Sequence, residues 1–127
     1  MKIRAPRLLR SANFVACSTM RAAEKIVVVE DLFVRNFVRT ALERQGHAVV
    51  CASISQATEF LRAGCANLLI TNTPAEFAEF GATVPLLYMA AFPDPANASR
   101  FKRWRAICKP FQNAELTSLV SQLLAPV

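Results

Sequence analysis

The sequence predicts an α/β domain with a parallel sheet covered by helices on both faces. Short apolar runs of strand length alternate along the chain with segments whose apolar residues recur at helical spacing. Parallel strands need crossover connections of this kind, and the connecting helices cover the faces of the sheet. The length of 127 residues favours one domain, and about 100 residues are enough to bury a sizeable core.

The pattern opens at residues 25–29, KIVVV, with a continuous β-branched run typical of a strand buried on both faces. A helix is predicted over 32–45, with Asp31 as its cap and Gly46 at its end. A second strand is predicted over 47–52. The apolar residues of the first helix that are expected to form one stripe are Phe33, Val34, Phe37, Val38, Ala41 and Leu42.

The rest of the pattern gives two more helices and three more strands. Ser53 and Gln56 have capping-box spacing at the start of the second helix. The last helix is predicted over 113–124, with Gln112 and Glu115 at cap spacing. The three further strands are predicted at 67–71, 84–90 and 106–108.

Two connections are short or irregular. Only residues 73–83 separate the third and fourth strands, and an average helix with its two loops needs more than this length. The sequence therefore predicts at most two helical turns in this connection. The next connection, 92–105, carries Pro93 and Pro95, so its helix is expected to begin near Ala96.

The positive charge is concentrated at the N-terminus. Residues 1–25 carry six Lys or Arg and one Glu, whereas 26–127 carry nine basic and eight acidic residues. We expect 1–24 to be a basic, unfolded extension, or the true start to be Met20; an organelle presequence is a third alternative. The charge does not by itself make the body of the protein a nucleic-acid binder.

Several classes of site are excluded by residue spacing. No apolar run approaches the ~18 residues of a membrane span. The four cysteines form no Cys-x-x-Cys pair and have no metal-ligand spacing with His47, the only histidine, which we expect at the surface. With one histidine and no suitable neighbours, no catalytic set can be assembled, so we do not expect an enzyme.

Three segments together resemble a known family. They are KIVVVEDLFVRNFVRTAL, NLLITNTP with VPLLYMAAF, and CKPFQNAEL. In this order they resemble the receiver domain of bacterial response regulators in two-component systems, over a domain assigned to 25–127. The resemblance implies a flavodoxin-like, doubly wound sheet of five parallel strands in the order 2-1-3-4-5, here with a shortened third helix. It also implies a cytoplasmic location.

In that family an acidic pair and an aspartate hold Mg²⁺, and the aspartate accepts a phosphoryl group from a histidine kinase. A hydroxyl residue and a lysine bind the phosphoryl oxygens, and an aromatic residue on the fifth strand responds. The resemblance places the acidic pair at Glu30 and Asp31 and the lysine at Lys109. These residues either bind Mg²⁺ weakly, or cap the first helix and neutralise one another across the strand ends.

The other family positions lack their chemistry. The phosphoacceptor position falls on Asn72, the hydroxyl position on Ala90 and the switch aromatic on Ala106. An aspartyl phosphate needs a carboxylate nucleophile, which an amide cannot replace. We therefore expect no phosphorylation and no cofactor beyond weakly bound Mg²⁺.

RFKRWR, residues 100–105, is expected at the end of the fourth helix, on the face that binds partners in the family. It is predicted to be an interaction face for an acidic protein, a solvated helix end with its aromatic residues in the core, or a nucleic-acid site in which bases stack on Trp104. The residues of this predicted face are Arg100, Phe101, Lys102, Arg103, Trp104 and Arg105.

The resemblance and the losses together predict a stand-alone, degenerate receiver in phosphorelay signalling. It would act by phosphorylation-independent contacts with a histidine kinase, a phosphotransferase or a regulator, without a membrane, and a homodimer is a further alternative. The alternative function is nucleic-acid binding through the basic tail and residues 100–105.

Overall fold

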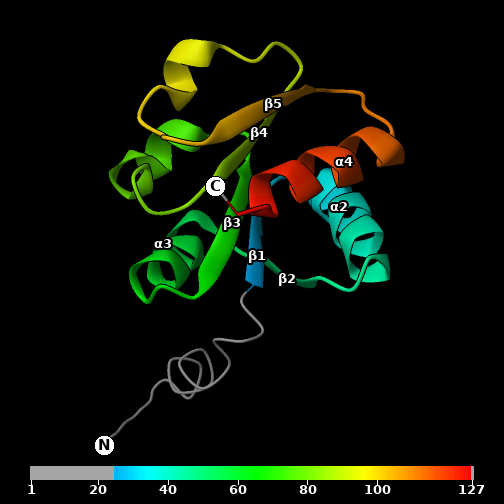
Figure 1. Cartoon of the computed structure of the whole chain (residues 1–127), viewed down its shortest axis with the longest axis horizontal. Coiled ribbons are helices and arrows are strands. Elements are labelled where there is room, and N and C mark those ends of the chain that lie inside the picture. The colour runs from blue at the N-terminus through cyan, green and yellow to red at the C-terminus, as the bar shows by residue number, and fades with distance from the viewer. Residues whose placement is uncertain (1–24, 127) are drawn as a thin grey trace, which may run out of the picture.

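The computed structural model describes residues 25–126 and contains a parallel five-stranded sheet in the order β2-β1-β3-β4-β5 (Figure 1). The predicted fold class and strand order are therefore confirmed. The strands are β1 (Lys25–Val29), β2 (Ala48–Cys51), β3 (Ala66–Thr71), β4 (Leu86–Ala90) and β5 (Trp104–Cys108). The helices are α2 (Leu32–Arg44), α3 (Ile54–Arg62) and α4 (Asn113–Leu124), with the 3₁₀ helices η2 (Pro74–Phe80) and η3 (Pro95–Ala98). The predicted extension, 1–24, lies outside the described residues.

The sheet is covered on both faces, as the β-branched run of β1 predicted. Ile26 and Val28 pack in the cluster that α2 and α4 cover, whereas Val27 and Val29 pack with α3, η2 and η3. Figure 1 shows α2 and α4 side by side on one face, and α3 on the other. No helix within 25–126 is long and apolar enough to cross a membrane.

Local signals fixed the ends of two helices. The side chain of Asp31 accepts a hydrogen bond from the backbone of Val34 at the start of α2. Ser53 and Gln56 form the predicted reciprocal capping box of α3. Gly46, which follows the C-cap residue Gln45 of α2, has φ +91°, a left-handed conformation that favours glycine. Gln112 is the N-cap of α4, as predicted, but its side chain makes no capping hydrogen bond.

The predicted stripe on α2 was too broad. Val38, Ala41 and Leu42 are buried, but Phe33 and Phe37 are exposed. At 3.6 residues per turn, the stripe from Phe33 to Leu42 spans about half the circumference of the helix. The sheet covers only part of that width, so the two phenylalanines face solvent.

The two short connections meet each other. The connection before β4 contains only η2, which confirms the predicted shortening, and the next contains only the four-residue η3. The backbone N–H of Lys102 donates to the carbonyl of Gly81 at 3.0 Å. A Cβ atom at Gly81 would overlap the carbonyl group of Arg100, so only glycine allows this approach.

The placement of RFKRWR at a helix end was wrong. No longer helix forms between η3 and β5, and β5 begins at Trp104, two residues earlier than predicted. Phe101 is buried just before the strand, and its N–H bonds back to the carbonyl of Ala98. This anchor and the bond to Gly81 extend the chain into β5 instead of continuing a helix.

Candidate functional site

The candidate site lies where the carboxyl ends of the parallel strands meet. Glu30 and Asp31 follow β1, Asn72 follows β3, Ala90 ends β4 and Lys109 follows β5. In an open parallel sheet this edge is the usual place for a ligand site. The fold therefore brings together five of the positions that the sequence singled out.

Glu30 and Lys109 form an ion pair between β1 and β5. The Lys109 Nζ donates to Glu30 Oε1 at 3.1 Å and lies 3.0 Å from Oε2. The backbone N–H of Asp31 also donates to Glu30 Oε1, at 3.1 Å. The Glu30 side chain is fully buried and that of Lys109 is 24% exposed. A buried carboxylate needs such partners, because removing it from water without them is costly.

Asp31 has a separate role from Glu30. Its side chain is exposed, and Oδ1 accepts from the N–H of Val34 at 3.1 Å. This bond satisfies one of the free N–H groups of the first turn of α2, and the negative charge lies at the positive end of the helix dipole. The geometry thus matches the predicted capping and neutralising role for the acidic pair.

The donor set does not fit a resident Mg²⁺ ion. Residues 25–126 contain no group of three or more His, Cys, Asp or Glu side chains that could hold a metal. Of the two carboxylates present, that of Glu30 already neutralises Lys109. Mg²⁺ demands oxygen ligands in near-ideal octahedral geometry, so it would have to displace the ammonium group first.

Asn72 is exposed and follows directly after the carboxyl end of β3. The hydroxyl of buried Thr71 accepts from the N–H of Thr73 at 3.1 Å and lies 3.2 Å from its hydroxyl. These contacts fix the turn that presents Asn72. An amide at this place has no charge and is not a nucleophile.

The positions of the missing hydroxyl and aromatic groups lie on β4 and β5. Ala90 is half-buried, and its carbonyl accepts from the N–H of Lys109 at 2.9 Å. Ala106 is exposed and lies in register with Tyr88.

Tyr88 was missed by the sequence reasoning. It is buried on β4, and its hydroxyl accepts from Asn97 Nδ2 at 3.1 Å and from the N–H of Asp94 at 3.4 Å. The aromatic group of this region is thus fixed under η3. The signal was a tyrosine within a predicted buried strand, because a buried phenol hydroxyl needs a partner.

Similar folds occur among solved structures. A response regulator receiver protein from Sinorhizobium medicae is 22% identical, with a TM-score of 0.66, covering 80% of this chain and 94% of that chain. The receiver domain of NtrX from Brucella abortus is 19% identical, with a TM-score of 0.66, covering 78% and 97%. A two-component response regulator from Clostridium difficile is 18% identical, with a TM-score of 0.66, covering 80% and 95%. This protein has the receiver-domain fold. No family model and no curated protein matches the sequence.

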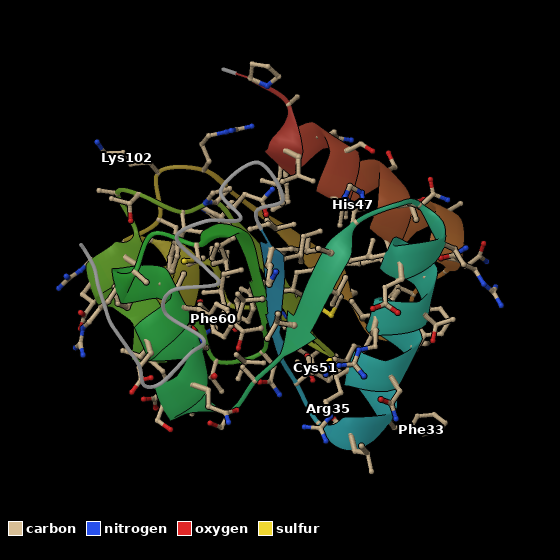
Figure 2. All side chains as sticks on the ribbon, turned by 90° about the horizontal axis from the view of Figure 1, so that it is seen from below. Phe33, Arg35, His47, Cys51, Phe60 and Lys102 are labelled. Atoms are coloured by element: carbon tan, nitrogen blue, oxygen red, sulfur yellow. The ribbon has the colours of Figure 1, made fainter. Side chains whose placement is uncertain are left out.

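The receiver fold here exposes large apolar side chains around the candidate site. Phe33 is 88% exposed at the start of α2, and Phe92 is 93% exposed after β4. Figure 2 shows Phe33 projecting outward from α2. Leu32 and Ile54, in the first turns after β1 and β2, and Phe37 are also exposed. Phe37 meets Phe111 edge to face, with ring centroids 5.7 Å apart. The sequence reasoning had placed Phe33 and Phe37 on the predicted apolar stripe.

The predicted interaction face at 100–105 is only partly on the surface. Phe101 is buried, Trp104 is half-buried against the core, and the guanidinium of Arg103 donates to the carbonyl of Gln122 at 3.1 Å. Arg100, Lys102 and Arg105 are exposed. Phe101 therefore cannot stack on a base, and Trp104 offers only part of its ring.

Proposed function

We propose that this receiver-fold protein acts in two-component signal transduction as a protein–protein interaction module that does not require phosphorylation. The observation that carries the proposal is Asn72 at the mouth of β3, beside a Glu30 carboxylate that is already paired with Lys109. Phosphoryl transfer to a receiver needs a carboxylate nucleophile at that place.

The relay that would report phosphorylation is also missing. Ala90 has no hydroxyl to bind a phosphoryl oxygen, and Ala106 has no ring to move. The only aromatic side chain of β4, Tyr88, is held by Asn97 and the backbone of Asp94. The positions 72, 90 and 106 offer no nucleophile with a neighbouring base. The role that we propose is therefore not enzymatic.

The surface around the site supports docking to proteins. The exposed rings of Phe33 and Phe92 follow different strands but lie at the same edge of the sheet. Aromatic side chains are enriched in protein interfaces relative to the rest of the surface. Partners that fit a signalling role are a histidine kinase, a phosphotransferase or a regulator, and we place the protein with them in the cytoplasm.

Incubation with acetyl phosphate and Mg²⁺ tests the missing acceptor. In native mass spectrometry the natural protein should gain no mass increment of a phosphoryl group, whereas Asn72→Asp should be labelled slowly. Asn36→Asp, on the exposed face of α2, makes the same change of charge and should stay unlabelled. A hydroxylamine-sensitive phosphate on the natural chain would overturn the proposal.

Partner capture from the native host tests the interaction itself. The natural chain should retain a two-component protein after nuclease treatment, and Phe33→Ser with Phe92→Ser should lose it. If nuclease released all bound material, the nucleic-acid alternative would replace this proposal. Nucleic-acid affinity through n phosphate contacts would also fall with salt, at a log–log slope of about −0.9n.

A further inference from the structure

Within residues 25–126, the edge strand β5 has a row of backbone groups with no neighbouring strand to pair with. In the order β2-β1-β3-β4-β5, the one strand of this part of the chain that pairs with β5 is β4. The N–H of Leu86 donates to the carbonyl of Arg103 at 3.0 Å, and the N–H of Lys109 donates to the carbonyl of Ala90 at 2.9 Å. Alternate residues of a parallel strand bond to the same neighbour. The N–H and C=O groups of Trp104, Ala106 and Cys108 therefore point away from β4.

The side chains along this edge leave it open. Ala106 and Cys108 are exposed, and both are small. They lie on the face where the connection before β5 contains only η3 and no longer helix. The strand at the opposite edge, β2, is shorter. The backbone groups of Val49 and Cys51 point away from β1, while their side chains pack against the core. Strand β5 is thus the edge at which an added strand would meet the least obstruction.

The segment of the sequence that contains β5 carries charges of one sign. Residues 95–114 contain five Lys or Arg and no Asp or Glu. Neither of the two ion pairs within residues 25–126, Arg62–Glu79 and Lys109–Glu30, involves Arg100, Lys102 or Arg105. All three of these cations are exposed, and Figure 2 shows Lys102 at the periphery of the molecule.

We propose that the outer edge of β5 binds an extended, acidic segment of a partner protein as a sixth strand of the sheet. Addition of a strand satisfies the outward backbone groups, and alternate side chains of the segment supply the specificity. Acidic side chains on one face would lie near Arg105. Apolar side chains on the other face would lie over Ala106 and the exposed part of Trp104.

The charge also selects against other occupants. A second copy paired through the same edge would bring the cations around Arg105 against their equivalents, which is unfavourable in a low-salt solution. Charged residues on an edge strand also protect proteins against aggregation. If this were the sole role of the cations, the edge of β5 would bind no acidic strand, and a binding experiment distinguishes the two cases.

The inference rests on the proposed role as an interaction module, but its test needs no phosphoryl donor. The probe is a synthetic peptide of about eight residues, a usual strand length, with alternating Glu and Val. The full chain is titrated with it and followed by amide NMR. The amides of Trp104, Ala106 and Cys108 should move downfield, and their hydrogen exchange should slow by about tenfold or more at saturation. The same peptide with N-methyl groups on its pairing edge should not produce these changes.

Two variants locate the contact. Ala106→Pro removes one outward N–H without removing a bond to β4, and proline is tolerated at such edge positions. It should abolish binding. Arg105→Glu should weaken binding by about tenfold or more, while Arg39→Glu, an equal charge change on exposed α2, should not.

Three outcomes would overturn the inference. They are equal binding of the N-methylated peptide, equal binding by Ala106→Pro, and shifts that avoid the β5 amides. Any of them would show charge attraction alone, for example to the basic residues of 1–24. None would bear on the missing phosphoacceptor, because a label from acetyl phosphate is a separate observation.

Discussion

The four strands β1, β3, β4 and β5 end at the same side of the sheet with two different kinds of chemistry. The ends of β1 and β5 carry Glu30 and Lys109, which form an ion pair across the two strands between them. Those intervening strands, β3 and β4, end in the uncharged Asn72 and Ala90. The contrast shows that an ion pair can link two strands of a receiver fold although no phosphoacceptor carboxylate lies between them.

Removing the cation of the ion pair should have the largest effect. Lys109→Met leaves the Glu30 carboxylate buried without a cation, and should lower the free energy of unfolding by about 3 kcal/mol. Urea denaturation at neutral pH measures it. Adding Glu30→Gln to Lys109→Met should restore most of the loss, because no charge then remains buried. A loss below about 0.5 kcal/mol in Lys109→Met would show that the pair does not hold the edge together.

Removing the N-cap of α2, which follows the charged end of β1, should have a smaller effect on stability. Asp31→Ala deletes the acceptor for the N–H of Val34 and should cost about 1 kcal/mol of stability in the same denaturation experiment. Glu43→Ala removes an exposed acidic residue from the last turns of α2 and should change stability by less than about 0.5 kcal/mol. Equal effects of the two changes would assign Asp31 only a general charge effect.

Changing the uncharged residue at the end of β3 should have the smallest effect on stability. Asn72→Ala should alter the unfolding free energy by less than about 0.5 kcal/mol, because the side chain is exposed. Millimolar Mg²⁺ should leave the denaturation midpoint of the natural protein unchanged, since only an ion that binds the folded state raises it. A clear rise that Asn72→Ala removes would show that the amide completes a metal site.

Local signals predicted much of this arrangement. The cap at Asp31, the capping box at Ser53 and the length of β1 depend on neighbouring residues, so their patterns were visible in the sequence. The positions of Glu30 and Lys109 followed from the resemblance, and the fold brings them into contact.

Features that depend on distant packing were not predicted. The exposure of Phe33 depends on how much of the surface of α2 the sheet covers. The sequence of α2 alone does not determine that area. The early start of β5 depends on Phe101 entering the core and on Lys102 bonding to Gly81. The hydrogen bonds to the Tyr88 hydroxyl depend on how η3 folds back over β4.

The close approach of the chain at Gly81 bears on how this domain could be engineered. The carbonyl of Arg100 occupies the space that a side chain at Gly81 would need, and the N–H of Lys102 bonds to the Gly81 carbonyl. The two shortened connections therefore form one structural unit. A chimaera that transplants a longer helix from a related domain into one connection would displace the other, so the two segments should be exchanged together.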